Sequence, residues 1–277
     1  MRGRRPAGRR RLSDGERGDL TAQLLDPGVT VRAVIAARES GVLAGEACVT
    51  ETFRQLTPAL TARFERHDGD RLAPGDVVAT VEGPLASIVT AERTALNFLG
   101  HLSGIATATR ALVDAVHAVD KGVAVLDTRK TTPGLRALEK AAVRAGGGTN
   151  HRSSLSESIL LKDNHLAVLG IADGVGVARE TFPGTRVQVE CDTAEQVVVA
   201  VDAGADAVLL DNMTPEQAAR CVRAVRERRP EVYVEASGRI TLESAPAYAA
   251  AGVDAVSSGA LTHSVRALDL GLDFVEG

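Results

Sequence analysis

Residues 187–212, with the sequence VQVECDTAEQVVVAVDAGADAVLLDN, contain two short apolar runs separated by a segment with helical character. The runs are residues 187–189 and 207–210, and an acidic residue follows each at once, Glu190 and Asp211 respectively. Short β-branched runs that alternate with helices are typical of βαβ units in a parallel sheet. The stretch therefore predicts an α/β fold with carboxylates at the ends of two strands.

The same pattern continues on both sides of this stretch. The six apolar runs are residues 123–126, 158–161, 187–189, 207–210, 232–234 and 253–256. Each run except the last precedes a predicted helix, such as residues 215–228 or 242–251. Since six units fall short of the eight of a complete barrel, we expect an incomplete α/β barrel or an open doubly wound sheet.

The chain before residue 122 has a different pattern, that of a small α+β unit. We expect strands at residues 29–37 and 77–81 and a helix at residues 43–56. Thr90 is a plausible N-cap for a long helix that reaches about residue 119, with a break at Ser103-Gly104. These patterns predict an N-terminal domain over residues 12–105 and a barrel domain over residues 106–277, whose last residues are candidates for a return to the first domain.

Composition excludes several classes of protein. The 277 residues are 44% hydrophobic and 25% charged, which is incompatible with a disordered or collagen-like chain. No apolar run reaches the ~20 residues of a membrane span, so we expect no membrane insertion. With no Trp and 3% aromatic residues, the chain has little to stack on nucleic-acid bases. Three cysteines without metal-ligand spacing suggest free thiols in a reducing cytoplasm.

Charge is unevenly distributed. The net charge is −4, although residues 1–11 contain six Arg and no acidic residue, so the remainder is more acidic than the total indicates. No apolar segment of a secretory signal follows this arm. We expect a solvated, disordered arm and assign it no function.

Polar and charged residues follow all six runs. They are residues 127–130, 162–165, Glu190, 211–212, 235–238 and 257–259. Because the carboxyl ends of parallel strands open on one face, we expect these residues to surround an active site. If polar residues followed only one or two of the predicted strands, solvation of the strand ends would explain them. Because they follow all six, we favour a functional site.

The residue types differ from loop to loop. Arg129, Lys130 and Lys162, with His151 and Arg152 nearby, supply positive charge. Glu190 and Asp211 suit Mg²⁺ held partly through water and substrate oxygens. The Ser-Gly turns at residues 237–238 and 257–259 suit a phosphate. Together these groups predict an anionic, phosphorylated substrate.

Other catalytic motifs are missing from the sequence. We find no Ser-His-Asp or Cys-His pattern, no Walker loop and no dinucleotide-binding glycine motif. Gly146-Gly147-Gly148 follows a predicted helix and indicates a C-cap and flexible turn. Four histidines are interpreted as isolated surface or core residues: His67, His101, His117 and His263. His263 borders the last of the polar loops, so a functional role stays open for it alone among the four.

The chain resembles the quinolinate phosphoribosyltransferase family from about Asp14 to its C-terminus. The stretches that carry the resemblance are residues 18–21, 92–97, 101–107, 127–136, 146–152, 161–165, 209–212 and 259–264. The resemblance implies an N-terminal open-faced α/β sandwich, an incomplete α/β barrel and a homodimer. It also implies a cytoplasmic enzyme of NAD biosynthesis that converts quinolinate and phosphoribosyl pyrophosphate (PRPP) to nicotinate mononucleotide, pyrophosphate and CO₂ with Mg²⁺.

The resemblance also implies roles for individual residues. Quinolinate would be bound by Arg93 reaching across the dimer and by Thr128, Arg129, His151, Arg152 and Lys162. PRPP would be bound by Lys130, Glu190, Asp211, Ser237, Gly238, Arg239, Ser258, Gly259 and Ala260, and Mg²⁺ by Glu190 and Asp211. The residues expected to act in catalysis are Arg129, Lys130, Lys162, Glu190 and Asp211.

The sequence departs from the family's usual pattern at Ala141, Ser154, Glu157, Arg239 and Ser258. These departures leave open a paralogue that acts on another pyridine carboxylate, such as nicotinate, or an inactive paralogue that only binds. A nucleic-acid-associated protein is a further alternative because of the arginine-rich arm. Outside this arm, however, the Lys and Arg residues expected to bind substrate lie in loops at strand ends, whereas binding to a phosphate backbone requires a basic surface patch.

Overall fold

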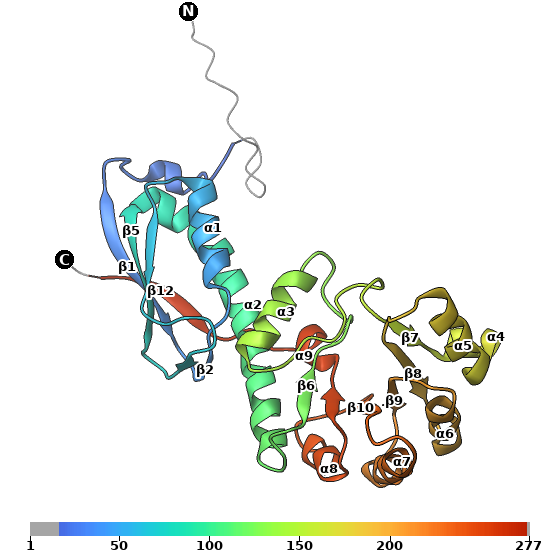
Figure 1. Ribbon diagram of the computed structural model, residues 1–277. Helices are drawn as coiled ribbons and strands as arrows, with labels where there is room; N and C mark the ends of the chain where they lie inside the picture. Colours follow the sequence, from blue (N-terminus) through green and yellow to red (C-terminus); the bar gives the residue numbers. More distant parts are fainter. Residues whose placement is uncertain (1–16, 276–277) are drawn as a thin grey trace, which may run out of the picture.

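The computed structural model describes residues 17–275, so the predicted basic arm lies outside the described residues. Figure 1 shows a domain built around β1 and β5, a second domain built around β6–β11, and the long helix α2 running between them. None of the helices in the described part of the chain combines the length and apolar character that a membrane span requires.

The N-terminal domain is an antiparallel sheet covered by helices. Its strand order is β12-β1-β5-β3, and a two-stranded sheet pairs β2 with β4. The bounds are η1 Ala22–Leu24, β1 Thr30–Ala37, β2 Gly41–Val42, α1 Glu46–Leu56, β3 Thr61–Phe64, β4 Arg71–Leu72, β5 Val77–Pro84, α2 Leu85–His117 and β12 Leu270–Phe274. This arrangement confirms the predicted open-faced α/β sandwich.

Alternation of side chains along β1 explains why the helices cover one face. Ala33, Ile35 and Ala37 are buried, whereas the residues between them are only partly buried. Successive residues of a strand point to opposite faces, so these three face the core. They pack in one cluster with Phe53 of α1 and Leu99 of α2.

The second domain is a curved sheet of six parallel strands in the order β6-β11-β10-β9-β8-β7. The strands are β6 Ala124–Leu126, β7 Ile159–Leu161, β8 Val187–Cys191, β9 Ala207–Asp211, β10 Tyr233–Ser237 and β11 Ala255–Ser257. The helices are α3 Arg136–Ala145, α4 Asp163–Leu169, α5 Ile171–Thr181, α6 Ala194–Asp202, α7 Pro215–Arg228, α8 Ala245–Ala250 and α9 Ala260–His263. Because β6 and β7 are the two edges, the sheet is an incomplete barrel, as predicted.

Several strands extend further than the sequence pattern indicated. β8 includes Glu190 and β10 includes Glu235 and Ser237, so Glu235 lies inside a strand and not in the loop where we expected it. Glu235 is accommodated inside the sheet because it accepts a hydrogen bond from the Gln188 side chain on β8. The helices after β8 and β9 then begin at capping boxes, in which Thr193 and Thr214 accept hydrogen bonds from backbone N–H groups.

Helix α2 corrects two predictions. It begins at Leu85, five residues before the expected N-cap Thr90, and it continues without a break through Ser103-Gly104. The Ser103 hydroxyl accepts a hydrogen bond from the Ala44 backbone N–H at 3.0 Å and donates to the Ala44 carbonyl. A Cβ at Gly104 would overlap the Arg266 carbonyl oxygen. The small residues therefore serve close packing, not helix termination.

The chain returns to the first domain at its end. After α9, residues 265–269 cross α2, and β12 pairs antiparallel with β1 from Ala33↔Phe274 to Ala37↔Leu270. Figure 1 shows this last strand beside β1, far from the other strands of the second half of the chain.

Candidate active site at the carboxyl ends of the parallel strands

The ends of β9 and β10 are held together by their backbones. Asp211 and Ser237 are paired in register, and the Asn212 N–H donates to the Ser237 carbonyl at 3.0 Å. Asn212 has φ 53° and Gly238 has φ 92°, both in the left-handed region. A Cβ at Gly238 would overlap the Asn212 side chain, so only glycine fits this turn. The two predicted loops therefore form one continuous surface.

The loops after β6 and β11 are also joined. The Ser258 N–H donates to the Leu126 carbonyl, and the Thr262 hydroxyl donates to the Lys130 carbonyl at 2.7 Å. A Cβ at Gly259 would lie 2.9 Å from Cδ of Lys130. Gly259 thus leaves the room in which the Lys130 side chain lies across the start of α9. Lys130 and Gly259, two of the residues expected to bind PRPP, therefore lie side by side.

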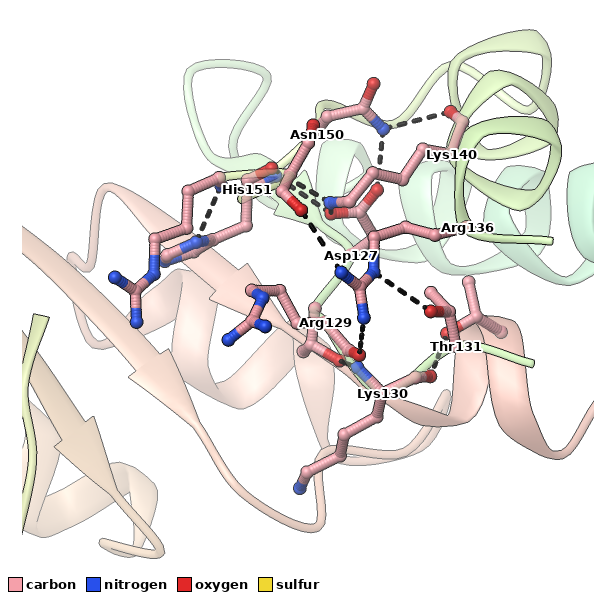
Figure 2. Close-up of polar contacts among 12 residues, drawn as sticks. Asp127, Arg129, Lys130, Thr131, Arg136, Lys140, Asn150 and His151 are labelled. Carbon is pink, nitrogen blue, oxygen red and sulfur yellow. Dashed lines mark hydrogen bonds and ion pairs between the residues drawn. The ribbon is translucent and has the colours of Figure 1, made fainter. Parts of the chain in front are cut away.

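A buried aspartate organises this corner of the site, and our sequence analysis gave it no role. Asp127 is fully buried and forms an ion pair with Lys140, which is 3% exposed (Figure 2). It also accepts hydrogen bonds from the Asn150 side chain at 2.6 Å and from the His151 backbone N–H at 2.9 Å. Burial raises the pKa of Asp127, although Lys140 opposes the shift. One carboxylate therefore ties the β6 loop to the loop that carries Arg152.

Two residues of α3 fix the path of the loop after Asp127. Arg136 donates from Nε to the Thr131 hydroxyl at 3.1 Å and from Nη2 to the Arg129 carbonyl at 3.3 Å (Figure 2). Glu139, fully buried, accepts from the Thr132 N–H at 3.1 Å and contacts His101 Nε2 at 2.9 Å. The interpretation of His101 as an isolated residue is therefore wrong, because α2 and α3 bring it beside a buried carboxylate.

Arg129 and Arg152 form a site of concentrated positive charge. The buried Nε of Arg129 has no hydrogen-bond partner among residues 17–275. Arg152 donates from Nη1 to the Ser158 carbonyl at 2.8 Å, and burial together with the nearby positive charge of Arg129 lowers its pKa. Two guanidinium groups with mutually unfavourable charges and an unused donor are suited to an anion with two carboxylates.

Lys162 and the two predicted metal ligands lie at the next strand ends. Lys162 forms an ion pair with Glu190; their side chains are 45% and 13% exposed. Asp211, on the neighbouring strand β9, accepts a hydrogen bond from the Asn212 side chain at 2.7 Å. Within the described chain, no three His, Cys, Asp or Glu residues are grouped as a metal cage. Two carboxylates on adjacent strands fit Mg²⁺ that shares its remaining ligands with substrate phosphates and water.

A polar cluster lies beneath these loops, inside the barrel. Glu235 is 2% exposed and accepts a hydrogen bond from the Gln188 side chain at 2.8 Å. His151 Nε2 lies 3.3 Å from the same oxygen of Glu235. Burial acts to raise the pKa of Glu235, but its contacts with His151, Ser257 and Gln188 outweigh burial and hold the pKa below its ordinary value. Glu235 follows an apolar run in the sequence, and no individual role was predicted for it.

The remaining predicted residues have mixed positions. Arg93 is 75% exposed and lies in the part of α2 that packs on the N-terminal core; its ion-pair partner within the described chain is Glu92, at 3.8 Å. Arg239 is exposed after β10. The buried Ser258 hydroxyl donates to the Ile240 carbonyl at 3.2 Å, and the Ser258 N–H donates to the Leu126 carbonyl, so both donors of Ser258 are used within the described chain. Thr128 accepts from the Lys130 N–H.

The site has no evident nucleophile. Cys191 follows Glu190, but burial raises the pKa of its thiol to about 12. Cys221 is also buried, and burial raises its pKa. Because a thiolate is the reactive form of cysteine, neither suits covalent catalysis. The arrangement suits charge neutralisation and alignment of anionic substrates, with glycine-rich turns that expose backbone N–H groups to phosphate.

Two family models cover nearly all the described chain. They are the N-terminal domain of quinolinate phosphoribosyl transferase, over residues 19–103, and its C-terminal domain, over residues 105–273. A probable nicotinate-nucleotide pyrophosphorylase (carboxylating) of Bacillus subtilis is 43% identical over 265 residues, which is 95% of this chain and 90% of that protein. The human nicotinate-nucleotide pyrophosphorylase (carboxylating) is 39% identical, over 87% of this chain and 81% of its own.

Solved structures with the same architecture include nicotinate-nucleotide pyrophosphorylases from two bacteria. The Ehrlichia chaffeensis structure has a TM-score of 0.89 at 33% identity and covers 95% of this chain and 94% of its own. The Francisella tularensis structure has a TM-score of 0.88 at 37% identity, with coverage of 95% and 92%. The human nicotinic acid phosphoribosyltransferase shares the fold alone, at 13% identity and a TM-score of 0.63 over 89% of this chain and 70% of its own.

Proposed function

The chain belongs to the quinolinate phosphoribosyltransferase family, and from that premise we propose how its residues carry out the family's reaction. The enzyme transfers the phosphoribosyl group of PRPP to quinolinate with loss of CO₂, which gives nicotinate mononucleotide for NAD biosynthesis. It is a pentosyltransferase, and its two substrates are quinolinate and PRPP.

Arg129, Arg152 and Lys162 bind the two carboxylates of quinolinate in this proposal. Within the described residues, the Nε of Arg129 has no hydrogen-bond partner, and the pKa of Arg152 is lowered by burial and by the charge of Arg129. Both observations support this role. A guanidinium is a planar fork of donors that matches a carboxylate. Thr128 and His151 border the same loops. Binding of the dianion would relieve the repulsion between the two arginines.

The substrate pocket needs to align the pyridine nitrogen, and no general base is required. The nitrogen of quinolinate carries no proton, so it attacks C1 of the ribose directly as pyrophosphate leaves. Positive charge develops at the sugar in that transition state, and negative charge develops on the departing pyrophosphate, where the metal that Glu190 and Asp211 would hold could neutralise it. After transfer, the positive ring nitrogen stabilises the carbanion left by departure of CO₂, and this carbon then takes a proton from water to give nicotinate mononucleotide.

The other side of the site holds PRPP. Lys130 lies against Gly259, and the turn at Ser237-Gly238 exposes backbone N–H groups that suit a phosphate. Ala260 begins α9 directly after Gly259, and the side chain of Arg239 is exposed after β10, so we assign both to PRPP; Ser258 lies next to Gly259 and is assigned a supporting role. Glu190 and Asp211 would hold Mg²⁺, which neutralises the pyrophosphate when bound.

We propose a cytoplasmic homodimer in which Arg93 completes the site of the other protomer. The exposed side chain of Arg93, on the outward part of α2, supports this assignment. The free thiols of Cys48, Cys191 and Cys221 support a reducing compartment.

The observation that carries the residue assignment is the close approach of two like-charged guanidinium groups, Arg129 and Arg152, at the carboxyl end of the sheet. The first experiment incubates the protein with PRPP, Mg²⁺ and either quinolinate or nicotinate, and follows nicotinate mononucleotide by mass. We expect product from quinolinate alone, and its loss when EDTA removes the metal. Product from nicotinate alone would contradict the dicarboxylate assignment and favour the paralogue.

A further inference from the structure

The buried contact between Glu235 and His151 has no part in the mechanism above. We propose that Glu235 is a positioning residue that fixes the orientation and tautomer of the His151 ring, and through the ring the backbone at Arg152. This inference rests on the proposed function, because its effect on catalysis is an effect on binding of the pyridine dicarboxylate.

The two ring nitrogens of His151 have opposite roles. The Arg152 backbone N–H donates to Nδ1 at 2.8 Å, so Nδ1 carries no proton. The proton is therefore on Nε2, which lies 3.3 Å from an oxygen of Glu235. In the other neutral tautomer, and in the imidazolium form, Nδ1 would carry a proton and could not accept the Arg152 N–H. Only the Nε2–H tautomer satisfies both contacts.

His151 is held at every polar atom by the protein itself. Its backbone N–H donates to Asp127 at 2.9 Å, and its carbonyl accepts from Lys140 at 2.9 Å. The ring provides the two further contacts, to Glu235 and to the N–H of Arg152. In this arrangement neither ring nitrogen is free, so His151 acts on the pocket by fixing where the Arg152 main chain lies.

Glu235 is a poor choice if the only requirement is stability. It is 2% exposed, and its Oε1 has no hydrogen-bond partner within residues 17–275. The buried Ser257 hydroxyl lies close enough to this carboxylate to lower the pKa of Glu235. A buried carboxylate facing a neutral imidazole costs desolvation, and an apolar side chain of similar volume serves stability as well or better. A buried charge at this position therefore points to a requirement of the site and not of the fold.

The first test is spectroscopic and needs no substrate. In ¹⁵N-labelled protein at neutral pH, long-range ¹H–¹⁵N correlation spectra distinguish the two neutral tautomers and the imidazolium, and a His151→Gln variant identifies the signals of this ring. We expect the Nε2–H tautomer. An Nδ1–H tautomer or an imidazolium would overturn the proposal.

The second test compares three variants in steady-state kinetics. Glu235→Leu removes the acceptor, and we expect loss of the Nε2–H signature with a rise of about tenfold in KM for quinolinate and a change below about threefold in KM for PRPP. Glu235→Gln keeps a carbonyl acceptor, so we expect it to preserve the tautomer and the KM for quinolinate within about threefold. An equal rise in both KM values in Glu235→Leu, or a tenfold rise in Glu235→Gln, would overturn the inference.

Gln188→Leu is the matched control. Gln188 is 6% exposed and donates to the same oxygen of Glu235 at 2.8 Å, but it does not contact His151 within hydrogen-bond distance. We expect an unchanged tautomer and unchanged KM values; effects as large as those of Glu235→Leu would show a merely structural role. If Glu235→Leu does not fold, the proposal can still be tested by the tautomer in the spectrum of the unmodified protein. The KM values of Glu235→Gln and Gln188→Leu test it as well. Failure of the proposed function would appear separately, as an unmodified protein that makes no product.

Discussion

Arg129 and Arg152 illustrate how single residues are placed for substrate binding and not for stability. Burial and the neighbouring charge of Arg129 lower the pKa of Arg152, which means that the fold disfavours its charged form. A dianionic ligand would supply, on binding, the stabilisation that the charged form of Arg152 lacks in the free protein. Removing one arginine should therefore affect turnover far more than folding.

Arg152→Ala should lower kcat/KM for quinolinate by about 100-fold or more, the effect of losing a charge-assisted contact worth about 3 kcal/mol. Its free energy of unfolding should stay within about 1 kcal/mol of the original. Initial rates and urea denaturation measure the two quantities. Arg223→Ala, on the exposed face of α7, is the control and should change neither. A normal rate in Arg152→Ala would contradict the substrate assignment.

Glu235 predicts a dependence of stability on pH. Its pKa in the fold lies below the ordinary 4.5, so the ionised carboxylate contributes stability that is present above pH 4.5 and lost as the pH falls through the lower folded value. The difference in unfolding free energy between the original protein and Glu235→Gln should therefore be larger at pH 6 than at pH 3.5. Urea denaturation at the two pH values measures it, and a difference that is constant or grows in acid would contradict the sign.

Sequence reasoning identified the residues that follow apolar runs, because the ends of parallel strands share one face. It gave no role to Asp127, Lys140 and Glu235, because their function depends on partners far along the chain. Glu235 meets Gln188 across 47 positions, and Asp127 meets Asn150 across 23. A buried polar residue looks like any other strand or helix residue until the fold brings its partner beside it.

At the scale of elements, α2 shows why small residues in a helix were misinterpreted. Ser103-Gly104 suggested a break because glycine is a poor helix former. In the structure, Gly100 and Gly104 are spaced one turn apart and face the segment that leads to β12. These glycines allow two backbones to approach closely. Because the second backbone belongs to a segment more than 160 positions away, helix propensity alone could not predict this contact.

Two glycine-to-alanine variants should have opposite effects on stability. Gly104→Ala should lower the free energy of unfolding by about 1–3 kcal/mol, because its Cβ would overlap the Arg266 carbonyl. Gly176→Ala, in α5, has no atom within 4 Å of the added Cβ and should raise it by about 0.5–1 kcal/mol through helix propensity. Thermal and urea denaturation measure both. A stabilised Gly104→Ala would contradict the close-packing interpretation.

At the scale of the whole molecule, the site described in one chain lacks the contribution that we assign to Arg93. If Arg93 acts in the other protomer, two damaged proteins can restore one intact site. Arg93→Ala and Lys130→Ala should each be nearly inactive alone. When the two are unfolded together in equal amounts and refolded, random dimerisation should return about a quarter of the original sites. Activity that stays at the level of the separate variants would contradict a shared site.

The pairing of β12 with β1 affects how the chain can be made. Although the first domain is encoded first, its sheet receives its edge strand from residues 270–274, after every strand of the second domain has been synthesised. During translation the barrel can therefore assemble while β1 still exposes an open edge to neighbouring chains. Residues 270–274 close that edge only after they have been synthesised, so a chain that stops before β12 would keep the strands of the catalytic face and expose the edge of β1 to other chains.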